Sequence, residues 1–421
     1  MANMFSTEDL NARVRFIEYE ITKAALRGTN LVPTATDRVY INSLANELFR
    51  LSEGKNEVIF DKLGRPSIMV NFYADEKSRC EYLASSNTLF DSAETGLPKI
   101  HPAFLIDNAP IAGFRLGKYQ ACRVNGVNYA VSLYRLPPAF SISAPGVFSL
   151  IDAANAGGYA GDDIHMITQA EFAFIGLLSA REAFQCRGND SYGKSYLVAS
   201  ESGEPCGPLS NSGDPLHIKT GTGPLQWRHD GTPFGVSDLR GNVSEWVAGY
   251  RCYGGELRFI PNNNSAKKGL VASDHLITSS LYKSLLEANV FGDVANADSM
   301  KYDYILDPGT ESESKSGIQV CKTLTYQQQN NNPYASVALS GMTAASGLTV
   351  PGYLKLMLMY PLLTGTPQGT VYMRNTAGTE YGVHRGGNWT VNSSAGFGYS
   401  SGRDDPTSSS TSVGFRVASL I

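Results

Sequence analysis

The segments Val383-His-Arg-Gly-Gly-Asn-Trp389 and Gly414-Phe-Arg-Val417 bracket the last part of this 421-residue chain. Between them, residues 390–412 show no apolar periodicity and consist mainly of Ser, Thr, Gly, Asp and aromatic residues. That composition alone would predict disorder. The closing residues Gly414–Ile421, however, predict a buried final strand. We therefore expect a long, polar, aromatic-tipped loop held at both ends by a folded scaffold, and loops displayed in this way usually bind a ligand.

Composition favours a loop-rich, largely β protein. The chain is 42% hydrophobic and 18% charged, with 42 glycines and a formal net charge of −4. Its length allows two or three domains. Low charge and abundant Gly, Ser, Asn and Tyr are typical of extracellular or virion proteins, not of helical cytosolic enzymes. No basic cluster rises above background, so we expect no nucleic-acid partner.

Targeting and cysteine patterns give further expectations. The first residues show neither a basic nor an apolar signal region, and the apolar stretch 354–363 is too short and interrupted to span a bilayer. We therefore expect no membrane insertion. No cysteine pair has CxxC spacing, which argues against structural zinc, and we favour free, mostly buried thiols over disulfides. The cysteines are Cys80, Cys122, Cys186, Cys206, Cys252 and Cys321.

The N-terminal part predicts a small α+β module over residues 1–95. Ser6-Thr-Glu-Asp9 begins a helix that ends at Gly28, and a second helix runs from about Thr36 to Gly54. Strands at 58–60 and 68–72 follow. The apolar faces of the helices indicate core packing, with docking to a partner helix as the alternative.

Beyond residue 100, short strands alternate with Gly/Pro turns. Residues 147–154 predict a short helix, and Thr168-Gln-Ala-Glu171 is a capping box that opens a helix to about Phe184. Residues 252–381 are expected to form an insertion. Its polar runs at 262–264, 311–316 and 327–332 predict surface loops.

Four segments, in order, resemble signature motifs of the formylglycine-generating-enzyme family, a variant of the C-type lectin fold. They are Ile167-Thr-Gln-Ala-Glu-Phe172, Phe234-Gly-Val-Ser-Asp-Leu-Arg-Gly-Asn-Val-Ser-Glu-Trp246, Arg385-Gly-Gly-Asn-Trp389 and Gly414-Phe-Arg416. The resemblance covers about residues 100–421. It implies an α+β fold class, in which a loop-rich domain of this lectin type, with short strands and two main helices, spans 96–421 after the 1–95 module.

The family contains oxidases and binding proteins, and cysteine placement separates them. Oxidase chemistry needs a thiolate pair between the last two motifs. Residues 385–421 contain no cysteine, and Cys252 and Cys321 match no motif of the family. We therefore expect no enzyme activity. A formylglycine-generating-type oxidoreductase with cysteines from elsewhere is the alternative.

Among the binding proteins, the layout is most similar to the variable proteins of diversity-generating retroelements, which include phage tropism determinants. In that group, adenine-directed mutagenesis rewrites the segment between the last two motifs. Codons derived from AAC cannot encode Lys, Glu, Gln, Met or Trp, and residues 390–412 contain none of these. A loop rich in Ser and Gly could also lack them by composition alone.

The candidate segment 390–412 has the composition of an antibody paratope, in which Tyr and Phe give contact area and Ser, Gly and Asn adapt. Tyr399 and Arg403 are expected to be exposed, whereas Phe397 is either a contact or a core residue. Residues 404–406 could simply form a turn. The leading ligand-binding candidates are Thr390, Val391, Asn392, Phe397, Tyr399, Arg403, Asp404 and Asp405, followed by Ser394, Ser401, Thr407, Ser408 and Ser410.

The turn at 240–246 matches one that binds calcium in the resembled family. The resemblance implies Ca²⁺ ligated by the carbonyls of Arg240, Gly241 and Val243 and by the Glu245 carboxylate, a ligand set that suits calcium. The alternative is that Glu245 caps a backbone or pairs with an arginine. Four further residues of the motifs are expected to be structural: Trp246 and Trp389 in the core, and Arg385 and Arg416 in buried charge pairs or carbonyl networks.

These features predict a phage receptor-binding protein at the tail tip, with the bacterial cell surface or cytoplasm as alternative locations. Residues 390–412 would bind a host cell-surface protein or glycan. Residues 1–95 would attach to other tail proteins or form an oligomer, with a trimer favoured, because many copies compensate for weak single-site affinity. A non-varying structural virion or cell-surface protein of the same fold is the alternative, since one sequence cannot reveal variability.

Overall fold

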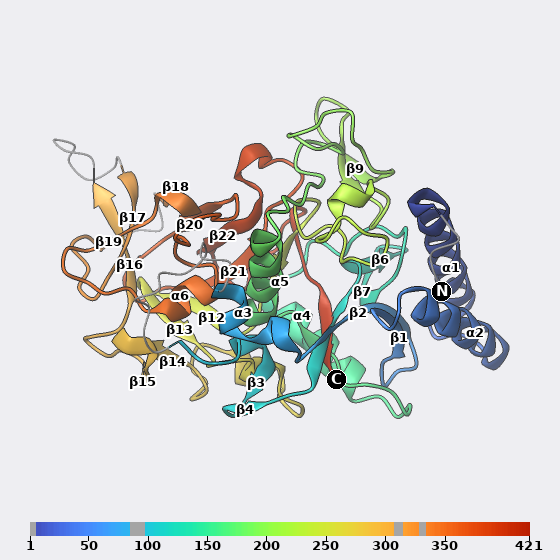
Figure 1. Ribbon diagram of the computed structural model, residues 1–421, viewed down its shortest axis with the longest axis horizontal. Coiled ribbons are helices and arrows are strands. Elements are labelled where there is room, and N and C mark those ends of the chain that lie inside the picture. Colours follow the sequence, from blue (N-terminus) through green and yellow to red (C-terminus); the bar gives the residue numbers. More distant parts are fainter. Residues whose placement is uncertain (1–5, 85–96, 307–314, 328–333) are drawn as a thin grey trace.

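The computed structural model describes residues 6–84, 97–306, 315–327 and 334–421. Two helices, α1 (Thr7–Arg27) and α2 (Ala35–Leu51), lie at one end of an elongated molecule (Figure 1). The hairpin of β16 (Lys301–Leu306) and β17 (Lys315–Cys321) lies at the other end. Helices and sheets are mixed along the chain, so the fold is α+β.

The helices begin where local capping chemistry places them. Ser6 caps α1 by accepting a hydrogen bond from the Asp9 backbone N–H, and Thr34 caps α2, two residues before the predicted start. The predicted capping box of α5 (Gln169–Arg181) is confirmed: Thr168 Oγ1 accepts from Glu171 N at 3.1 Å, and Glu171 Oε2 accepts from Thr168 N at 3.0 Å.

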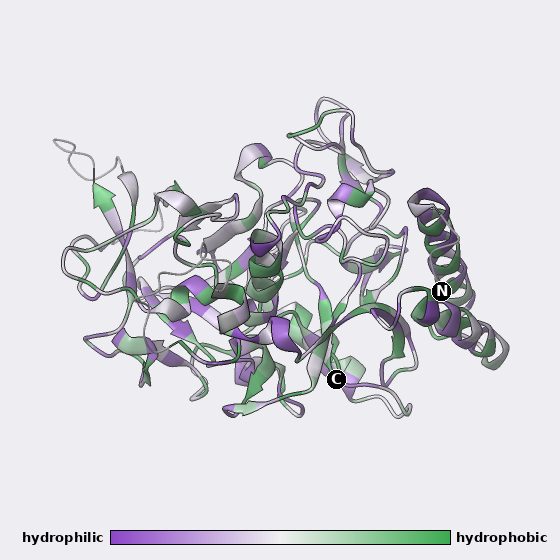
Figure 2. Cartoon of the chain, in the orientation of Figure 1, coloured by the Kyte–Doolittle hydropathy of each residue, from purple (hydrophilic) through white to green (hydrophobic). Residues whose placement is uncertain are grey.

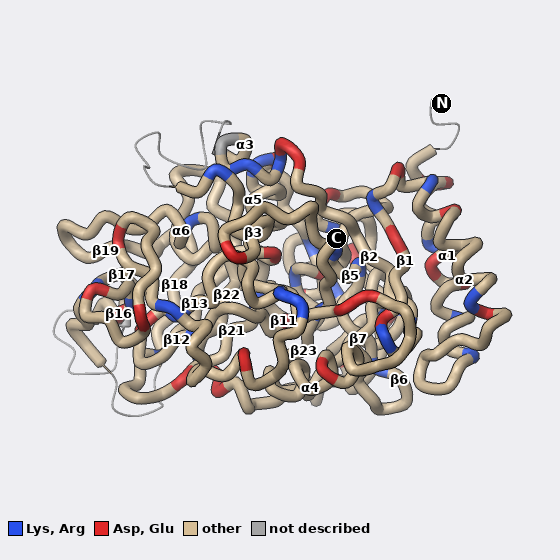
Figure 3. Tube along the Cα trace, turned by 90° about the horizontal axis from the view of Figure 1, so that it is seen from below, with Lys and Arg blue, Asp and Glu red and all other residues tan. Residues whose placement is uncertain are grey.

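The inner faces of α1 and α2 pack as core, as expected. Val14, Ile21 and Leu48 are buried in an apolar cluster that also includes residues between Tyr119 and Leu136. Figure 2 shows green apolar residues interleaved with purple polar residues along both helices, and Figure 3 shows both signs of charge on them. The outer faces expose large apolar side chains, among them Phe16, Val39 and Phe49.

A five-stranded sheet joins the two ends of the sequence. Its order is β1 (Asn56–Phe60), β2 (Pro66–Tyr73), β5 (Gly113–Gly117), β24 (Val417–Leu420) and β8 (His165–Met166). The predicted boundary at 95–96 lies outside the described residues. β2 pairs with β5 along Met69–Tyr73, and β5 pairs in turn with β24, so the strands before residue 95 continue into a sheet with later parts of the chain. The division at residue 95 stays a prediction.

The second sheet has 13 strands, and several of them come from the predicted insertion. Its main path is β18 (Ala335–Ala338), β20 (Thr370–Met373), β22 (Gly396–Asp404), β21 (Glu380–Gly386), β12 (Tyr250–Tyr253), β13 (Glu256–Phe259), β16, β17 and β19 (Thr343–Ala344). Residues 252–381 therefore supply much of the sheet, and whether they are an insertion in the sequence stays a prediction. β20 from this region pairs directly with β22 from the candidate segment.

Shorter elements surround these sheets. The remaining helices are α3 (Cys80–Ala84), α4 (Ala144–Asn155) and α6 (Gly352–Leu356). The remaining strands are β3 (Leu105–Ile106), β4 (Ala109–Pro110), β6 (Ala121–Val124), β7 (Val127–Ser132), β9 (Pro205–Leu209), β10 (Pro215–Ile218), β11 (Ser244–Trp246), β14 (Lys283–Leu285), β15 (Phe291–Gly292) and β23 (Val413–Gly414).

The polar run 262–264 is half-buried at Asn262 and Asn264, and its middle residue is internal. Asn263 is fully buried; its Oδ1 accepts from Thr168 Oγ1 at 2.7 Å, and its Nδ2 donates to Glu171 Oε1 at 3.0 Å. It therefore ties residues 262–264 to the start of α5. Most of the runs 311–316 and 327–332 lies outside the described residues.

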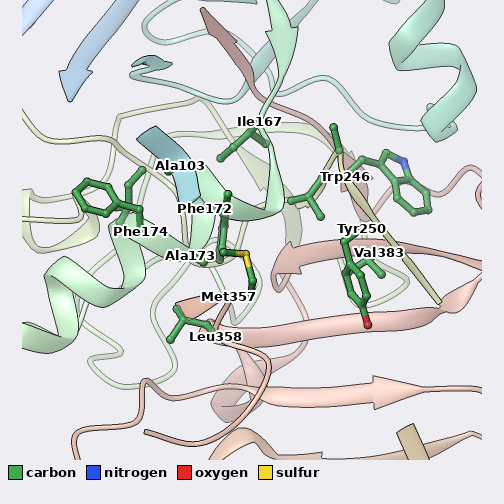
Figure 4. Close-up of a cluster of buried hydrophobic side chains, with 14 of the residues drawn as sticks. Ala103, Ile167, Phe172, Ala173, Phe174, Trp246, Tyr250, Met357, Leu358 and Val383 are labelled. Carbon is green, nitrogen blue, oxygen red and sulfur yellow. The ribbon is translucent and has the colours of Figure 1, made fainter. Parts of the chain in front are cut away.

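The main core surrounds α5 and is lined by both sheets. Phe174 packs against Phe72 of β2 and Phe114 of β5, and Figure 4 shows Phe172 on α5 with the buried residues Ile167, Trp246 and Val383. All six cysteines are free thiols, and five of them are buried, which confirms that expectation. Among the described residues, none of the helices is long and apolar enough to cross a membrane.

Candidate ligand-binding surface

The candidate segment 390–412 is not one loop. It comprises a 3-10 turn at Asn392–Ser394, the nine-residue strand β22, and an exposed loop over 405–412. β22 lies inside the sheet, parallel to β20 and antiparallel to β21, so both of its edges form backbone hydrogen bonds. Residues 396–402 are consequently buried, and only the ends of the segment reach the surface.

Burial removes three of the predicted contact residues. Phe397, Tyr399 and Ser401 are 5%, 1% and 0% exposed, so their assignment as surface contacts is corrected. Phe397 packs against the Phe172 ring, with centroids 5.8 Å apart. Burial also raises the pKa of Tyr399 well above its usual value. These side chains belong to the core that supports the surface.

The residues just before β22 form a half-buried rim. Thr390 Oγ1 donates to Tyr192 Oη at 3.2 Å, and the Asn392 backbone N–H donates to the Asp190 carbonyl at 2.8 Å. Val391 and Ser394 are also half-buried. This turn is thus held by the 190–192 segment and still presents side-chain surface.

The residues after β22 form a fixed exposed loop. Asp405 Oδ1 accepts from the Thr407 backbone N–H at 2.7 Å and from Thr407 Oγ1 at 2.6 Å. The alternative interpretation of this stretch as a turn is therefore confirmed. Ser408 and Ser410 are exposed, and the Ser410 carbonyl accepts from the Ser141 N–H at 2.9 Å. The loop is anchored through its backbone, which leaves its side chains at the surface.

Between these ends lies a surface that we call the Tyr–Arg face, formed by Tyr334, Tyr372, Ser394, Arg403 and Asp404. Arg403 Cζ lies 4.7 Å from the Tyr334 ring centroid and 4.9 Å from that of Tyr372. Tyr372 Oη donates to Ser394 Oγ at 3.3 Å. The face thus joins the turn before β22 to the residues at its far end.

Asp404 flanks this face as a carboxylate. Its Oδ2 lies 2.9 Å from His384 Nε2 and accepts from Ser401 Oγ at 3.4 Å. Burial opposes ionisation of Asp404, but the His384 hydrogen bond and the nearby charges, including Arg403, outweigh it and lower the pKa. Asp404 is therefore ionised at neutral pH.

The predicted calcium turn holds a side-chain amide instead. Gln120 Nε2 lies 2.9 Å from the Val243 carbonyl, 3.5 Å from the Gly241 carbonyl and 3.0 Å from Glu245 Oε1. An amide nitrogen donates hydrogen bonds and cannot ligate a cation. Arg416 completes the set, with Nη2 2.6 Å from Glu245 Oε1.

These residues do not fit a calcium ion, and the alternative of an arginine pair is correct. Arg240 was expected to contribute its carbonyl, and its guanidinium forms a buried salt bridge with Asp190 at 2.6 Å. Within the described ranges, no three His, Cys, Asp or Glu side chains come together to hold a metal. This turn is a protein-only network.

The other anchor residues are structural, as expected. Arg385 Nη2 donates to the carbonyls of Leu358 and Phe397 at 3.2 and 3.0 Å, and burial lowers the pKa of Arg385 to about 10. Trp246 is buried, and its Nε1 donates to the Ile142 carbonyl at 2.9 Å. Trp389 is only half-buried, a difference from the predicted core position.

Sequence analysis missed Tyr334 and Tyr372, because both lie in the region interpreted as an insertion. The alternation in Thr370-Val-Tyr-Met373 is typical of a strand and could have indicated β20. Nothing in the sequence shows that its partner is β22, since parallel pairing here joins segments about 30 residues apart.

Comparisons with known proteins give limited findings. No protein-family model matches the chain, and no curated protein matches it. Among solved structures, Treponema denticola variable protein 1 is similar at 11% identity with a TM-score of 0.31, covering 87% of this chain and 99% of that one. The Major Tropism Determinant I1 and P3c variants are each 12% identical with TM-scores of 0.27 and 0.28, covering 87% of this chain and 71% of theirs. Scores this low support no inference about the ligand of this chain.

Proposed function

We propose that this chain is a ligand-binding protein of the variable type encoded with diversity-generating retroelements, with a formylglycine-generating-enzyme-type C-type lectin fold. One observation carries the proposal. The candidate segment is fixed by a central strand paired on both sides, while its two Ser- and Thr-rich ends, one half-buried and one mostly exposed, reach the surface. Such a segment can change its surface side chains without losing its scaffold.

The ligand-binding surface comprises the turn at 390–394, the Tyr–Arg face and the loop at 405–412. We infer that it binds a host cell-surface molecule and that the protein acts as an adhesin on a phage tail. The four motifs that resemble the family, in the family's order, support this inference.

The protonation of the Cys252 and Cys321 thiols favours a ligand-binding role over an oxidase role. Burial raises the pKa of both Cys252 and Cys321 to about 12, so both are protonated thiols at neutral pH. Oxidase chemistry of the resembled kind requires thiolates. The proposal therefore includes no reaction.

The α1–α2 hairpin is the proposed attachment or oligomerisation surface. Its two helices expose the large apolar side chains of Phe16, Val39 and Phe49, and exposed apolar surface can mark an interaction site. A trimer would raise the avidity of a weak single site.

The test is to sequence the DNA flanking the gene and the segment itself across a population. We expect a second, near-identical copy of the stretch encoding residues 385–416 that differs at adenines, beside a reverse transcriptase. Substitutions should concentrate at 390–394 and 403–412 and spare buried positions such as Phe397. Finding neither a copy nor variation would contradict the variable-protein proposal and leave a fixed binding or structural role.

A further inference from the structure

We propose that Tyr334 and Tyr372 form a fixed clamp that presents the side chain at position 403, and that Arg403 binds a carboxylate on the surface of a partner protein. This inference rests on the proposed ligand-binding function and names the chemistry that the surface recognises.

The clamp is built outside the candidate segment. Tyr334 precedes β18 and Tyr372 lies in β20, and their ring centroids are 5.8 Å apart. Ser336 pairs with Tyr372, which pairs with Ser401, so these three side chains lie on one face of the sheet. The ring contacts of Arg403 with Tyr334 and Tyr372 place it at the same face. Both rings therefore come from residues outside segment 390–412 and flank position 403.

The position of Arg403 is set by a register shift. The pairing of β21 with β22 shifts between Gly382 and His384, where Gly382 faces Asp404 and His384 faces Ser401. An extra residue in one strand re-aims the side chains beside it. The Arg403 backbone is held as well, because its carbonyl accepts from Arg374 Nη1 at 2.7 Å.

The Arg403 guanidinium is held in place but has free donors. Its side chain is 32% exposed, and its nearest carboxylate oxygen, on Asp404, is 4.0 Å away. Within the described part of the chain its guanidinium makes ring contacts but no hydrogen bond. A planar guanidinium matches a carboxylate through two parallel hydrogen bonds. Because the rings already restrict its rotamers, less entropy is lost on binding.

The surroundings favour a protein partner. Tyrosine and arginine are the residues most enriched where binding energy concentrates in protein interfaces. Tyr334 is 40% exposed, and Ser394 adds a hydroxyl beside Tyr372. An acidic side chain of a partner would meet Arg403 within this patch, where Arg374, which donates to the Arg403 carbonyl, adds positive charge and the Asp404 carboxylate lies 4.0 Å from Arg403 Nε.

The probe is fluorescent poly-L-glutamate, tested for binding at low salt against the full-length protein. The wild type should bind, and added salt should weaken the binding because the contact is ionic. Arg403→Gln should bind about tenfold more weakly, and Arg403→Lys should recover only part of the loss because it lacks the planar fork. The matched control is Arg123→Gln, a half-buried arginine whose Cζ lies 4.7 Å from the Phe140 ring centroid and whose Nη1 donates to Asn128 Oδ1, which should bind like the wild type.

A charge reversal tests the role of the cation. Arg403→Asp should lose poly-L-glutamate binding altogether, because it replaces the guanidinium with a second carboxylate beside Asp404. Thermal melts should show that each variant at 403 is folded. If Arg403→Gln binds poly-L-glutamate like the wild type, or if only the sugar acid polygalacturonate binds, the inference is overturned. That result would leave the proposed function standing if the flanking DNA copy is found, so the two failures are distinguishable.

Discussion

Lys118 Nζ lies 2.6 Å from Glu18 Oε1, and both side chains are 0% exposed. The pair joins α1 to the chain segment that leaves β5. Lys118 also donates to Asn56 Oδ1 at 2.8 Å and to the Pro233 carbonyl at 2.7 Å, while Tyr119 Oη donates to Glu18 Oε2 at 2.6 Å. Four distant parts of the sequence thus meet at one ammonium group, although burial lowers the pKa of Lys118 to about 8.

Removing one member of this pair should destabilise the fold strongly. Lys118→Met leaves the Glu18 carboxylate buried without its cation, a change that costs about 3–5 kcal/mol. Urea unfolding would measure it. The double variant Lys118→Met/Glu18→Leu should recover part of the loss, because no charge is left unpaired. A single variant as stable as the wild type would show that the pair does not hold α1.

Calcium should have no effect on the stability of the wild-type protein. Gln120 Nε2 lies among the oxygens that a cation would need, and Arg416 neutralises Glu245. The melting temperature should be the same with millimolar calcium or with a chelator. Gln120→Ala should cost about 1–3 kcal/mol, because it leaves buried acceptors unsatisfied. A calcium-dependent rise in the wild type would contradict the amide assignment.

Acid should weaken the fold between about pH 6.5 and 4. Burial lowers the pKa of His101, His217 and His275 to about 4 each. The unfolded chain binds protons at these residues from about pH 6.5 downward and the folded chain does not, so stability is complete above pH 6.5 and falls toward pH 4.

Each histidine should lower the free energy of unfolding by about 1.4 kcal/mol for each pH unit by which the pH falls through that window. Urea unfolding at a series of pH values measures the slope. His217→Gln should reduce it, since His217 Nε2 bonds only the Thr411 carbonyl at 2.7 Å and needs no charge. A flat profile from pH 6.5 to 4.5 would refute the prediction.

Phe397→Ala should lower the stability of the fold, because Phe397 is a core residue and not a ligand contact. Phe397 is 5% exposed against Phe172, and truncating a buried phenylalanine costs about 3–5 kcal/mol. Ser408→Ala, in the exposed loop of the same segment, should stay within about 0.5 kcal/mol of the wild type. Chemical denaturation of both variants is the measurement. Equal stability of the two would place Phe397 at the surface.

The features that the sequence predicted correctly depend on short-range sequence signals or on composition. The caps at Ser6 and Thr168, the helix that follows each and the free thiols depend on neighbouring residues or on composition. Their chemistry is complete within a few positions, so periodicity and capping rules suffice.

What it missed depends on distant pairing. β22 is poor in apolar residues, so its sequence predicts a loop. It is a buried strand because it pairs with β20 and β21. The burial of Tyr399 and the clamp around Arg403 follow from that pairing. Gln120 lies in no motif, so its place among the oxygens of Val243 and Glu245 could not be inferred. Strand order and register were the missing information.

Strand β24 lies between β5 and β8 in the five-stranded sheet. The ribosome synthesises it after both of these strands and after the whole candidate segment. During synthesis, β5 must therefore wait with an unpaired edge until residues 417–420 leave the ribosome. Folding is thus late and dominated by contacts between distant parts of the chain, which slows it. A frameshift anywhere in 390–412 would delete this closing strand. The ribosome would then release a chain that cannot complete its sheet, so only variants read in frame to residue 420 would yield folded protein.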